Sequence, residues 1–272
     1  MNEANALESA PPPVILNEVK NPYPLRQITG RKAKQKMKNA QCIDCKNVPI
    51  SKRLLCCAEL VPPCGTVADV GTDHGYLGIH LLQSGKCARV IAADLREKPL
   101  ASARANAAEY RVSEQMSFVL SDGLHNIKPQ AFDTLVLAGM GGDLIANILS
   151  DAPWLDGGPY TLILQPQSAV NDLRRFLGER GWAIERERLV RDGHFLYAVM
   201  AVRPGQGREL TPGEQYVSPA LRRAGDPLYP DYLARVRRAL ELTVRGIAQS
   251  ADPSDLARAA YYRAALEEVS AL

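Results

Sequence analysis

The sequence predicts an α/β fold in which a mostly parallel seven-stranded sheet ends in an antiparallel hairpin and is followed by a C-terminal helical hairpin. Between residues 66 and 181, five short apolar strands are interspersed with four helical segments, which indicates right-handed βαβ units and a parallel sheet covered on both faces. Asp192-Gly193 then joins two strand-like runs, and such a dipeptide is a strong hairpin signal. From residue 229 onward, apolar residues recur at helical spacing on both sides of a proline break.

The composition is typical of a globular protein and excludes a membrane-spanning or wholly disordered chain. Of the 272 residues, 46% are hydrophobic and 23% are charged, and no apolar run approaches the ~20 residues of a membrane span. The length fits one large domain with an appendage. The N-terminus lacks the apolar core of a signal peptide, so the six cysteines favour a reducing, cytoplasmic location with free thiols.

Residues 1–49 are expected to form a disordered basic leader. This segment is rich in proline at its start and shows no helical or strand periodicity, and the native chain could begin at Met37. Residues 1–55 carry 10 Lys or Arg against 4 Asp or Glu, which suits either a phosphate-rich partner or simple solvation. Cys42 and Cys45 have the spacing of half a zinc site, but no second spaced pair follows, so we expect no metal.

The elements of the sheet follow one another along the chain from residue 51. Ser51 is a good N-cap for a first helix, which ends before Pro62-Pro63. Short β-rich runs predict five strands, and the segments between them are apolar, Ala-rich or show the i, i+1, i+4, i+5 spacing of a buried helix face. The expected strands are residues 66–71, 90–94, 116–120, 132–138 and 160–164. The expected helices are residues 76–82, 98–110, 144–149 and 170–181.

The hairpin strands, residues 182–191 and 194–202, distinguish this fold from an ordinary dinucleotide-binding fold, whose strands stay parallel. Five βα units followed by an antiparallel hairpin are typical of the class I, Rossmann-like methyltransferase sheet. We therefore expect a methyltransferase domain over residues 50–204, followed by a connector and an αα-hairpin over residues 205–272. The two helices of that hairpin, separated by Asp252-Pro253, cannot bury their apolar stripe alone.

The turn after the first strand, Asp69-Val-Gly71-Thr-Asp73-His74-Gly75, lies where α/β folds bind nucleotide-type cofactors. Gly71 lets the backbone approach a ligand closely. Asp73 stands where a dinucleotide fingerprint has its second glycine, and its carboxylate would repel a pyrophosphate but suits a cationic sulfonium. This favours S-adenosylmethionine over NAD, with a tight turn that binds no ligand as the alternative. His74 is a candidate for orienting a proton path, and Tyr76 flanks the same pocket.

Acidic residues also follow the second and third strands. Asp94 lies 23 residues beyond Gly71, about the separation at which an acidic side chain meets ribose hydroxyls. Asp122, in Ser121-Asp122-Gly123, is placed to accept a hydrogen bond from the adenine amine of a cofactor. Taken alone, each could be a strand-end cap or a turn residue. Three acids at three successive strand ends together indicate a cofactor site.

Two further motifs follow the fourth and fifth strands. Ala138-Gly139-Met140-Gly141-Gly142 lacks the Asp/Asn-Pro-Pro-aromatic motif with which many amino-group methyltransferases hold an exocyclic amine. Its glycines instead allow close backbone approach, which favours a ring nitrogen as methyl acceptor or, alternatively, a tightly packed helix N-terminus. Gln165-Pro166-Gln167 could hydrogen-bond the edge of a flipped base or anchor its own loop.

These motifs resemble those of the bacterial tRNA (adenine(22)-N1)-methyltransferases. The resemblance rests on Asp-Val-Gly-Thr-Asp-His-Gly-Tyr-Leu from Asp69, Leu-Ala-Gly-Met-Gly-Gly from Leu137 and Leu-Gln-Pro-Gln from Leu164, each at its expected strand end and in order. It runs from about residue 50 to residue 272 and includes the segment Ser51-Lys52-Arg53-Leu54 and the C-terminal helical hairpin. It implies S-adenosylmethionine as the methyl donor and the adenine at position 22 of tRNA as the acceptor.

The resemblance and the strand-end positions assign roles to individual residues. The expected catalytic residues are Asp73, His74, Tyr76 and Met140. The expected cofactor-binding residues are Asp69, Gly71, Thr72, Asp73, His74, Gly75, Asp94, Leu95, Asp122, Gly123, Ala138, Gly139 and Gly141. The expected substrate-binding residues are Gly142, Gln165 and Gln167 near the base and Arg222, Arg223, Arg235, Arg237, Arg238 and Arg245 for tRNA phosphates.

The expected reaction is direct in-line methyl transfer to N1 of a flipped-out adenine, without a covalent enzyme intermediate or a metal. Two alternatives stay open. One is a methyltransferase that acts on a protein or a small metabolite and uses its helical hairpin for oligomerisation. The other is a non-catalytic RNA-binding protein that keeps a relic of the cofactor pocket. The expected partner is tRNA, with no membrane association and with a monomer favoured.

Overall fold

The computed structural model describes residues 47–249 and 253–272, and for residues 253–257 it describes the backbone alone. These residues belong to one compact unit, Cys45–Leu272. The basic leader up to residue 46, with Met37, Cys42 and Cys45, lies outside the described residues. No helix within the described ranges is long and apolar enough to cross a membrane.

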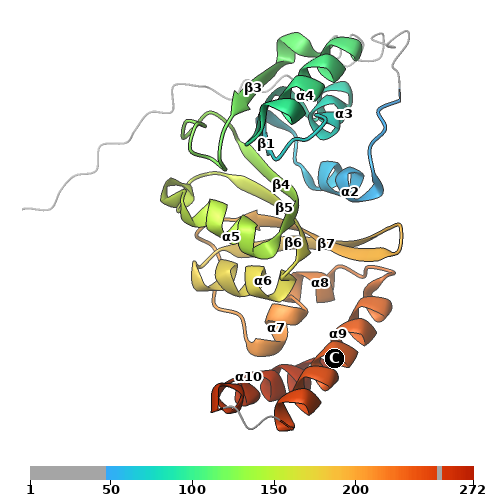
Figure 1. Ribbon diagram of the computed structural model, residues 1–272, viewed down its shortest axis with the longest axis vertical. Helices are drawn as coiled ribbons and strands as arrows, with labels where there is room; N and C mark the ends of the chain where they lie inside the picture. Colours follow the sequence, from blue (N-terminus) through green and yellow to red (C-terminus); the bar gives the residue numbers. More distant parts are fainter. Residues whose placement is uncertain (1–46, 250–252) are drawn as a thin grey trace, which may run out of the picture. The chain divides into compact units, whose positions relative to one another are not determined.

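The sheet has seven strands in the order β3-β2-β1-β4-β5-β7-β6 (Figure 1). The five strands β1 to β5 run parallel to one another, and β7 pairs antiparallel with both β5 and β6. The predicted methyltransferase-type sheet, with its terminal antiparallel hairpin, is therefore confirmed. The strands are β1 Cys64–Val70, β2 Cys87–Asp94, β3 Met116–Leu120, β4 Thr134–Gly141, β5 Thr161–Ser168, β6 Ala183–Asp192 and β7 Phe195–Arg203.

The helices between the strands lie close to their predicted positions, and two short ones lie in the connector that was predicted without helices. Ser51 caps the first helix as expected, because its hydroxyl accepts a hydrogen bond of 3.4 Å from the Leu54 amide. The two unexpected helices, α7 and α8, each follow a capping hydroxyl and begin with a proline, Thr211-Pro212 and Ser218-Pro219. The helices are α2 Lys52–Leu60, α3 Tyr76–Gln83, α4 Glu97–Glu109, α5 Gly142–Ser150, α6 Val170–Glu179, α7 Pro212–Tyr216, α8 Pro219–Arg223, α9 Tyr229–Ala248 and α10 Pro253–Ser270.

Successive side chains of the central strands face two separate apolar clusters. Val67 and Val136 pack on one face with residues of α2, α3 and α4, whereas Ala68 and Leu135 pack on the other face with residues of α5 and α6. Because neighbouring side chains of a strand point to opposite faces, a sheet covered on both sides requires strands that are apolar throughout. This is why the parallel strands read as continuous apolar runs.

Strands β4 and β5 extend beyond their predicted ends and carry two of the candidate motifs on their last residues. β4 reaches Gly141 and β5 reaches Ser168, because Met140 still pairs with Pro166 and Gly141 with Ser168 through register shifts. The prediction ended both strands early because apolar periodicity stops at glycine and proline. Backbone pairing continues there, and it places the motifs at the rim of the sheet.

The C-terminal helices pack on the β6–β7 side of the sheet through a third apolar cluster. α9 buries Tyr232, Leu233, Val236 and Leu240, which meet residues of β6, β7, α8 and α10. The helical pair therefore covers its apolar stripe with the sheet, as expected for helices that cannot bury it alone. The domain boundary at residue 204 stays a prediction.

A buried ion pair, which the sequence did not predict, also holds this region together. Arg174 of α6 and Glu187 of β6 are both fully buried, and Nη2 of Arg174 donates a 2.5 Å hydrogen bond to Glu187 Oε1. Arg174 Nη1 also donates to the carbonyl oxygens of Gln215 and Tyr216 at 3.0 and 2.7 Å. Tyr232 of α9 accepts a further hydrogen bond of 3.0 Å from the same guanidinium. Arg174 of α6 thus binds the sheet, the connector and the first C-terminal helix.

Candidate functional site

The end of β1 places a buried carboxylate at the carboxyl edge of the sheet. Asp69 is 4% exposed, and its Oδ2 accepts a 2.7 Å hydrogen bond from Thr72 Oγ1. Burial raises the pKa of Asp69 to about 6; the hydrogen bond from Thr72 lowers that pKa, and the neighbouring Asp94 raises it. A carboxylate that burial makes costly to ionise favours a cationic partner at this position.

The turn after β1 is tight and stays at the same edge of the sheet. Gly71, Asp73 and Gly75 all have positive φ, at 78°, 49° and 73°. A Cβ on Gly71 would collide with Cε of Met140, so the β1 turn and the end of β4 are in direct contact. The structure therefore brings together Gly71 and Met140, two residues predicted for one site from motifs about 70 residues apart.

Three predicted catalytic side chains lie together on the exposed side of this turn. Nε2 of His74 lies 3.7 Å from Asp73 Oδ1, and the two side chains are 54% and 74% exposed. The His74 ring stacks on Tyr76 with 5.7 Å between ring centroids. The backbone carbonyl of His74 accepts a 2.8 Å hydrogen bond from Asn106 of α4, which fixes the turn. Asp73 and His74 are exposed, whereas Tyr76 is half-buried.

The end of β2 places Asp94 directly beside the β1 turn. Asp94 is 8% exposed, and its Oδ1 accepts a 2.9 Å hydrogen bond from the Arg96 amide. No hydrogen bond from a residue that the structure describes reaches its second oxygen, Oδ2, which is therefore available to a ligand. The predicted strand-end cap and the predicted ribose contact are thus compatible. Leu95, the next residue, is 62% exposed and offers an apolar surface at the same edge.

The turn after β3 presents the third predicted acid. The Ser121 amide donates to the Asp94 carbonyl at 2.9 Å, which sets this turn beside the end of β2. Ser121 Oγ donates to the Gly123 carbonyl at 3.0 Å, and Gly123 has a φ of 53°. The turn is thus held by its backbone and by Ser121, and the Asp122 side chain is exposed.

The glycine motif at the end of β4 forms an irregular backbone segment. Gly139 has a φ of 80°, and its amide donates a 3.1 Å hydrogen bond to Gln165 Oε1. Gly141 is the N-cap of α5. Ala138, at the start of the motif, is a half-buried residue of β4. A Cβ on Gly142 would collide with the backbone of Ala169, which favours the packing interpretation for Gly142 over base contact.

The two glutamines of the β5 motif lie in different surroundings. Gln165 is fully buried, and its Oε1 accepts hydrogen bonds of 3.1 Å from Gly139 and from Nη1 of Arg53. Its Nε2 donates to the Pro166 carbonyl at 3.1 Å, so the anchoring interpretation is favoured for this residue. Gln167 is exposed and stays available to a substrate. Arg53 was not assigned a role from the sequence, where its signal was the segment Ser51-Lys52-Arg53-Leu54.

The six predicted tRNA-binding arginines divide into two groups. Arg235 donates to the Leu196 carbonyl at 3.1 Å, and Arg237 donates to the carbonyls of Val269 and Ser270 at 3.2 and 3.3 Å. These two side chains join secondary-structure elements. Arg235 is exposed despite its hydrogen bond, and so are the remaining four, namely Arg222, Arg223, Arg238 and Arg245.

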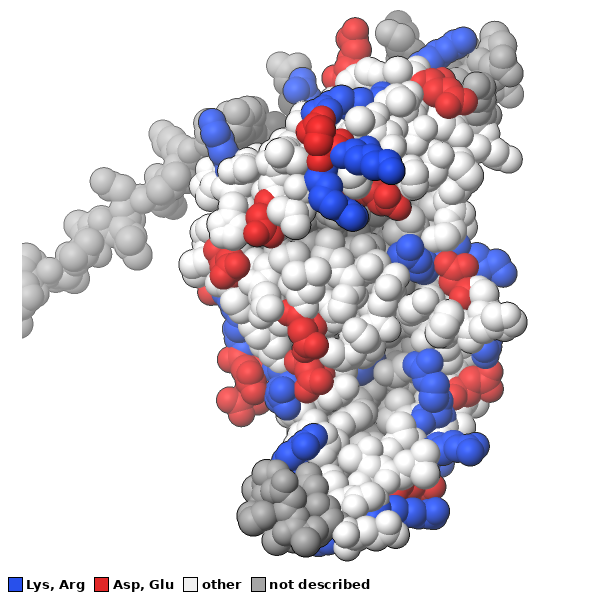
Figure 2. All heavy atoms as spheres, viewed as in Figure 1, with Lys and Arg blue, Asp and Glu red and all other residues white. Residues whose placement is uncertain are grey.

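A surface groove of about 540 Å³ runs along α9 and includes Arg237, Arg238 and Arg245 with the exposed Leu242. Figure 2 shows Lys and Arg side chains along the right-hand edge of the C-terminal helices, interrupted by a few acidic ones. The groove is thus mainly basic with an apolar element. It lies on a helix that packs against the β6–β7 hairpin.

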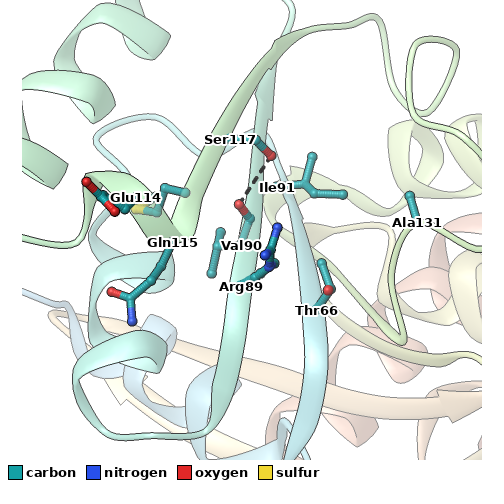
Figure 3. Close-up of a pocket in the computed structure, with 9 residues that line it drawn as sticks. Thr66, Arg89, Val90, Ile91, Glu114, Gln115, Ser117 and Ala131 are labelled. Atoms are coloured by element: carbon teal, nitrogen blue, oxygen red, sulfur yellow. Dashed lines mark hydrogen bonds between the residues drawn. The ribbon is translucent and has the colours of Figure 1, made fainter. Parts of the chain in front are cut away.

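A second pocket, of about 360 Å³, lies at the opposite, amino end of the strands (Figure 3). Its walls come from the first half of β1, β2 and β3, and the Ser117 hydroxyl donates to the Val90 carbonyl at 3.5 Å. None of the predicted site residues lines this pocket, and in open α/β sheets ligands bind beyond the carboxyl ends of the strands. Within residues 47–249 and 253–272, no three His, Cys, Asp or Glu side chains are grouped to hold a metal ion.

Comparison with known proteins agrees with this geometry. Residues 50–200 match a family described as a methyltransferase domain. The tRNA (adenine(22)-N(1))-methyltransferase of Bacillus subtilis (strain 168) is 32% identical over 156 residues, which span 57% of this chain and 66% of that protein, just under two thirds of its length. The solved structure of the B. subtilis m1A22 tRNA methyltransferase matches with a TM-score of 0.73 and 25% identity, covering 83% of this chain and 99% of that one.

A second solved structure contains a ligand. It is a putative tRNA (m1A22) methyltransferase of Streptococcus pneumoniae in complex with S-adenosyl-L-methionine. It matches with a TM-score of 0.67 and 27% identity, covering 80% of this chain and 99% of that one. In both structural matches the similarity extends over nearly the whole of the related chain.

Proposed function

The chain belongs to the family of bacterial tRNA (adenine(22)-N1)-methyltransferases, and from this membership we propose that it methylates N1 of adenine 22 in tRNA. One observation carries the proposal: Asp69, Asp94 and Asp122 stand at the carboxyl ends of three adjacent strands, β1, β2 and β3. The glycine-rich end of β4 lies beside them on the other side of β1. The carboxylates proposed for the cationic methyl donor therefore lie next to the glycine backbone proposed for the acceptor base.

S-Adenosylmethionine fits the residues at this edge. The buried Asp69, with a raised pKa and a single hydrogen bond from a described side chain, favours a ligand that brings positive charge, as the α-amino and sulfonium groups of this cofactor do. Oδ2 of Asp94 suits a ribose hydroxyl, and the exposed Asp122 suits the adenine amine. When bound, the cofactor supplies the methyl group. The S. pneumoniae relative carries the same cofactor.

The protein's own contribution to the reaction is mainly positioning. We assign the backbone of Gly139 and Gly141, which was expected to bind the cofactor, to the acceptor base, because it lies on β4, across β1 from the carboxylates of β2 and β3. Arg53 Nη1 and Ser168 Oγ would lie 3.0 and 3.2 Å from a Cβ on these two glycines, and Met140 packs against Gly71. Adenine N1 in a stem faces its pairing partner, so the nucleotide must first be extracted, at a cost of a few kcal/mol. The methylated ring is a cation, and the exposed carboxylate of Asp73 is placed to stabilise it.

The test of this function is incubation of the purified chain with unmodified tRNA and a labelled methyl donor. We expect 1-methyladenosine in the digested tRNA, and none in a tRNA whose adenine 22 is replaced by guanine. Label in a protein extract or in small metabolites instead would support the alternative substrate classes. Cofactor binding without any methyl transfer would support a non-catalytic RNA-binding protein. We propose a cytoplasmic location for this enzyme.

The exposed arginines of α8 and α9 are proposed to bind tRNA phosphates. Replacing Arg223, Arg238 and Arg245 by glutamine is expected to weaken tRNA binding by about tenfold or more at low salt, because each phosphate contact releases counterions. The slope of log affinity against log salt should fall by about 2 to 3, at roughly 0.7–0.9 per contact. Filter binding across a salt series measures both quantities.

A matched control removes three arginines that already have acidic partners. Arg104, Arg175 and Arg203 pair with Glu97, Asp172 and Glu185 at 2.5, 3.0 and 2.8 Å. Their replacement by glutamine lowers the net charge by the same amount. The salt slope is nevertheless expected to stay within about 0.5 of the wild-type value, which is less than the contribution of one phosphate contact. Equal effects of the two triple variants would show that overall charge, rather than the C-terminal helices, determines binding.

A further inference from the structure

Arg53 reaches the carboxyl edge of the sheet from α2, a helix that the proposed function does not use. Its side chain is 26% exposed, and Nη1 donates a 3.1 Å hydrogen bond to Gln165 Oε1. The same oxygen accepts a 3.1 Å hydrogen bond from the Gly139 amide. The guanidinium also lies directly against Gly139, because a Cβ there would be 3.0 Å from Nη1. Arg53 is therefore in contact with the β4 segment that we assign to the acceptor base.

A second contact holds Arg53 from the hairpin side. Its backbone amide donates to Asp192 Oδ2 at 3.4 Å, and its Nε lies 3.9 Å from the same oxygen. Asp192 is the last residue of β6, next to the turn of the β6–β7 hairpin, which lies beside α2 (Figure 1). The guanidinium is thus held between the hairpin and the ends of β4 and β5.

The contact between Arg53 and Gln165 determines how the Gln165 amide is oriented. Gly139 has a positive φ and lies where the β4–β5 register shifts, so its amide depends on the Gln165 side chain for a partner. A glutamine amide can rotate by half a turn, which would place its NH₂ group against the Gly139 amide and leave two donors facing each other. The hydrogen bond from Gln165 Nε2 to the Pro166 carbonyl holds one side of this amide. A guanidinium only donates, so Arg53 holds the other side and keeps the oxygen of Gln165 turned toward Gly139.

We propose that Arg53 is a positioning residue for methyl transfer, which fixes the Gln165 amide and through it the Gly139 backbone that receives the acceptor adenine. This inference rests on the proposed function. Arg53 acts through Gln165 and Gly139 rather than on the reacting atoms. Its loss therefore affects the rate of transfer and leaves the binding of the cofactor, on the far side of β1, unchanged.

The test compares Arg53→Met, Gln165→Met and the double variant in single-turnover methylation with saturating tRNA and cofactor. We expect each single variant to lose about 10- to 100-fold in rate, since a displacement of about 1 Å costs roughly 10²-fold. The double variant should lose no more than the worse single variant, because both substitutions break one network. The dissociation constant for the cofactor and the KM for tRNA should each stay within about threefold of wild type, less than 1 kcal/mol.

Arg186→Met is the matched control, because Arg186 binds the other end of the same helix. Its Nη2 donates to the Leu60 carbonyl at 2.7 Å, so its loss loosens α2 away from the site. We expect a wild-type transfer rate from this variant. An unchanged rate in Arg53→Met would overturn the inference, and so would a higher KM for tRNA at an unchanged rate, which would indicate a phosphate contact instead. A wild-type chain that makes no 1-methyladenosine would overturn the proposed function and the inference together.

Discussion

Replacing Asp69 by asparagine is expected to weaken S-adenosylmethionine binding by about 30- to 150-fold at pH 7.5. The substitution keeps the size of the side chain but removes the buried negative charge at the end of β1. A hydrogen bond to a charged group in a protein contributes about 2–3 kcal/mol, which corresponds to this factor at 25 °C. Isothermal titration calorimetry of the wild type and the variant measures the change.

The pH dependence of binding provides a second readout for the same residue. Burial raises the pKa of Asp69 to about 6 in the free protein, and a cationic ligand stabilises only the ionised form. Below pH 6 the ligand must therefore displace a proton, and the association constant should fall by up to about tenfold per pH unit. Above pH 7 this effect is absent. Asp69→Asn has no such proton to lose, so its affinity should not follow this dependence.

Asp133→Asn is the control for disruption of β1. Asp133 accepts hydrogen bonds from the amides of Gly65 and Thr66 at 2.9 and 2.8 Å, at the amino end of the same strand. We expect its cofactor affinity to stay within about twofold of wild type, less than 0.5 kcal/mol. The melting temperature of Asp69→Asn should not decrease. Burial makes the ionised carboxylate of Asp69 unfavourable, and the substitution replaces it with a neutral amide. Wild-type affinity in Asp69→Asn would exclude Asp69 from the cofactor site.

The sequence predicted the sheet well because strands such as β1 and β4 are buried on both faces and therefore read as continuous apolar runs. The Asp192-Gly193 signal correctly indicated the antiparallel hairpin, although the two-residue turn is Gly193-His194, since Asp192 pairs with Phe195. Periodicity failed where the backbone pairs without apolar side chains, at the ends of β4 and β5. It also missed α7 and α8, which have five residues each and are too short for a periodic pattern.

The candidate site was predictable to the extent that its residues follow strand ends. Asp69, Asp94 and Asp122 were placed by that rule, and the structure sets them along one edge of the sheet. Arg53 was not placed, because it is separated by 112 residues from Gln165, and spacing along the chain does not reveal such a contact. Arg174 was not predicted to be buried either, because an arginine side chain on a helix is ordinarily expected to face water.

Replacing Glu187 by glutamine is expected to lower the free energy of unfolding by about 3–5 kcal/mol, because it leaves the Arg174 cation buried without its counter-ion. Burial lowers the pKa of Arg174, but Glu187 and Tyr232 raise it above its ordinary value, so the guanidinium stays charged at every accessible pH. Ser218 also donates its hydroxyl hydrogen bond to Glu187 and loses a charged acceptor. Urea denaturation followed by circular dichroism measures the change.

The control is Arg175→Met, the neighbouring residue on α6, whose partners Asp172 and Glu179 are exposed to solvent. Its ion pairs are half-exposed, and such pairs contribute about 0–1 kcal/mol. Arg174 bonds to Gln215 and Tyr216 of α7 and to Tyr232 of α9. When its ion pair with Glu187 is lost, we therefore expect α7 and α9 to detach from the sheet before the sheet itself unfolds. We therefore expect Glu187→Gln to lose tRNA affinity at temperatures where it still binds S-adenosylmethionine. Simultaneous loss of both affinities on warming would show instead that the sheet and the C-terminal helices unfold as one cooperative unit.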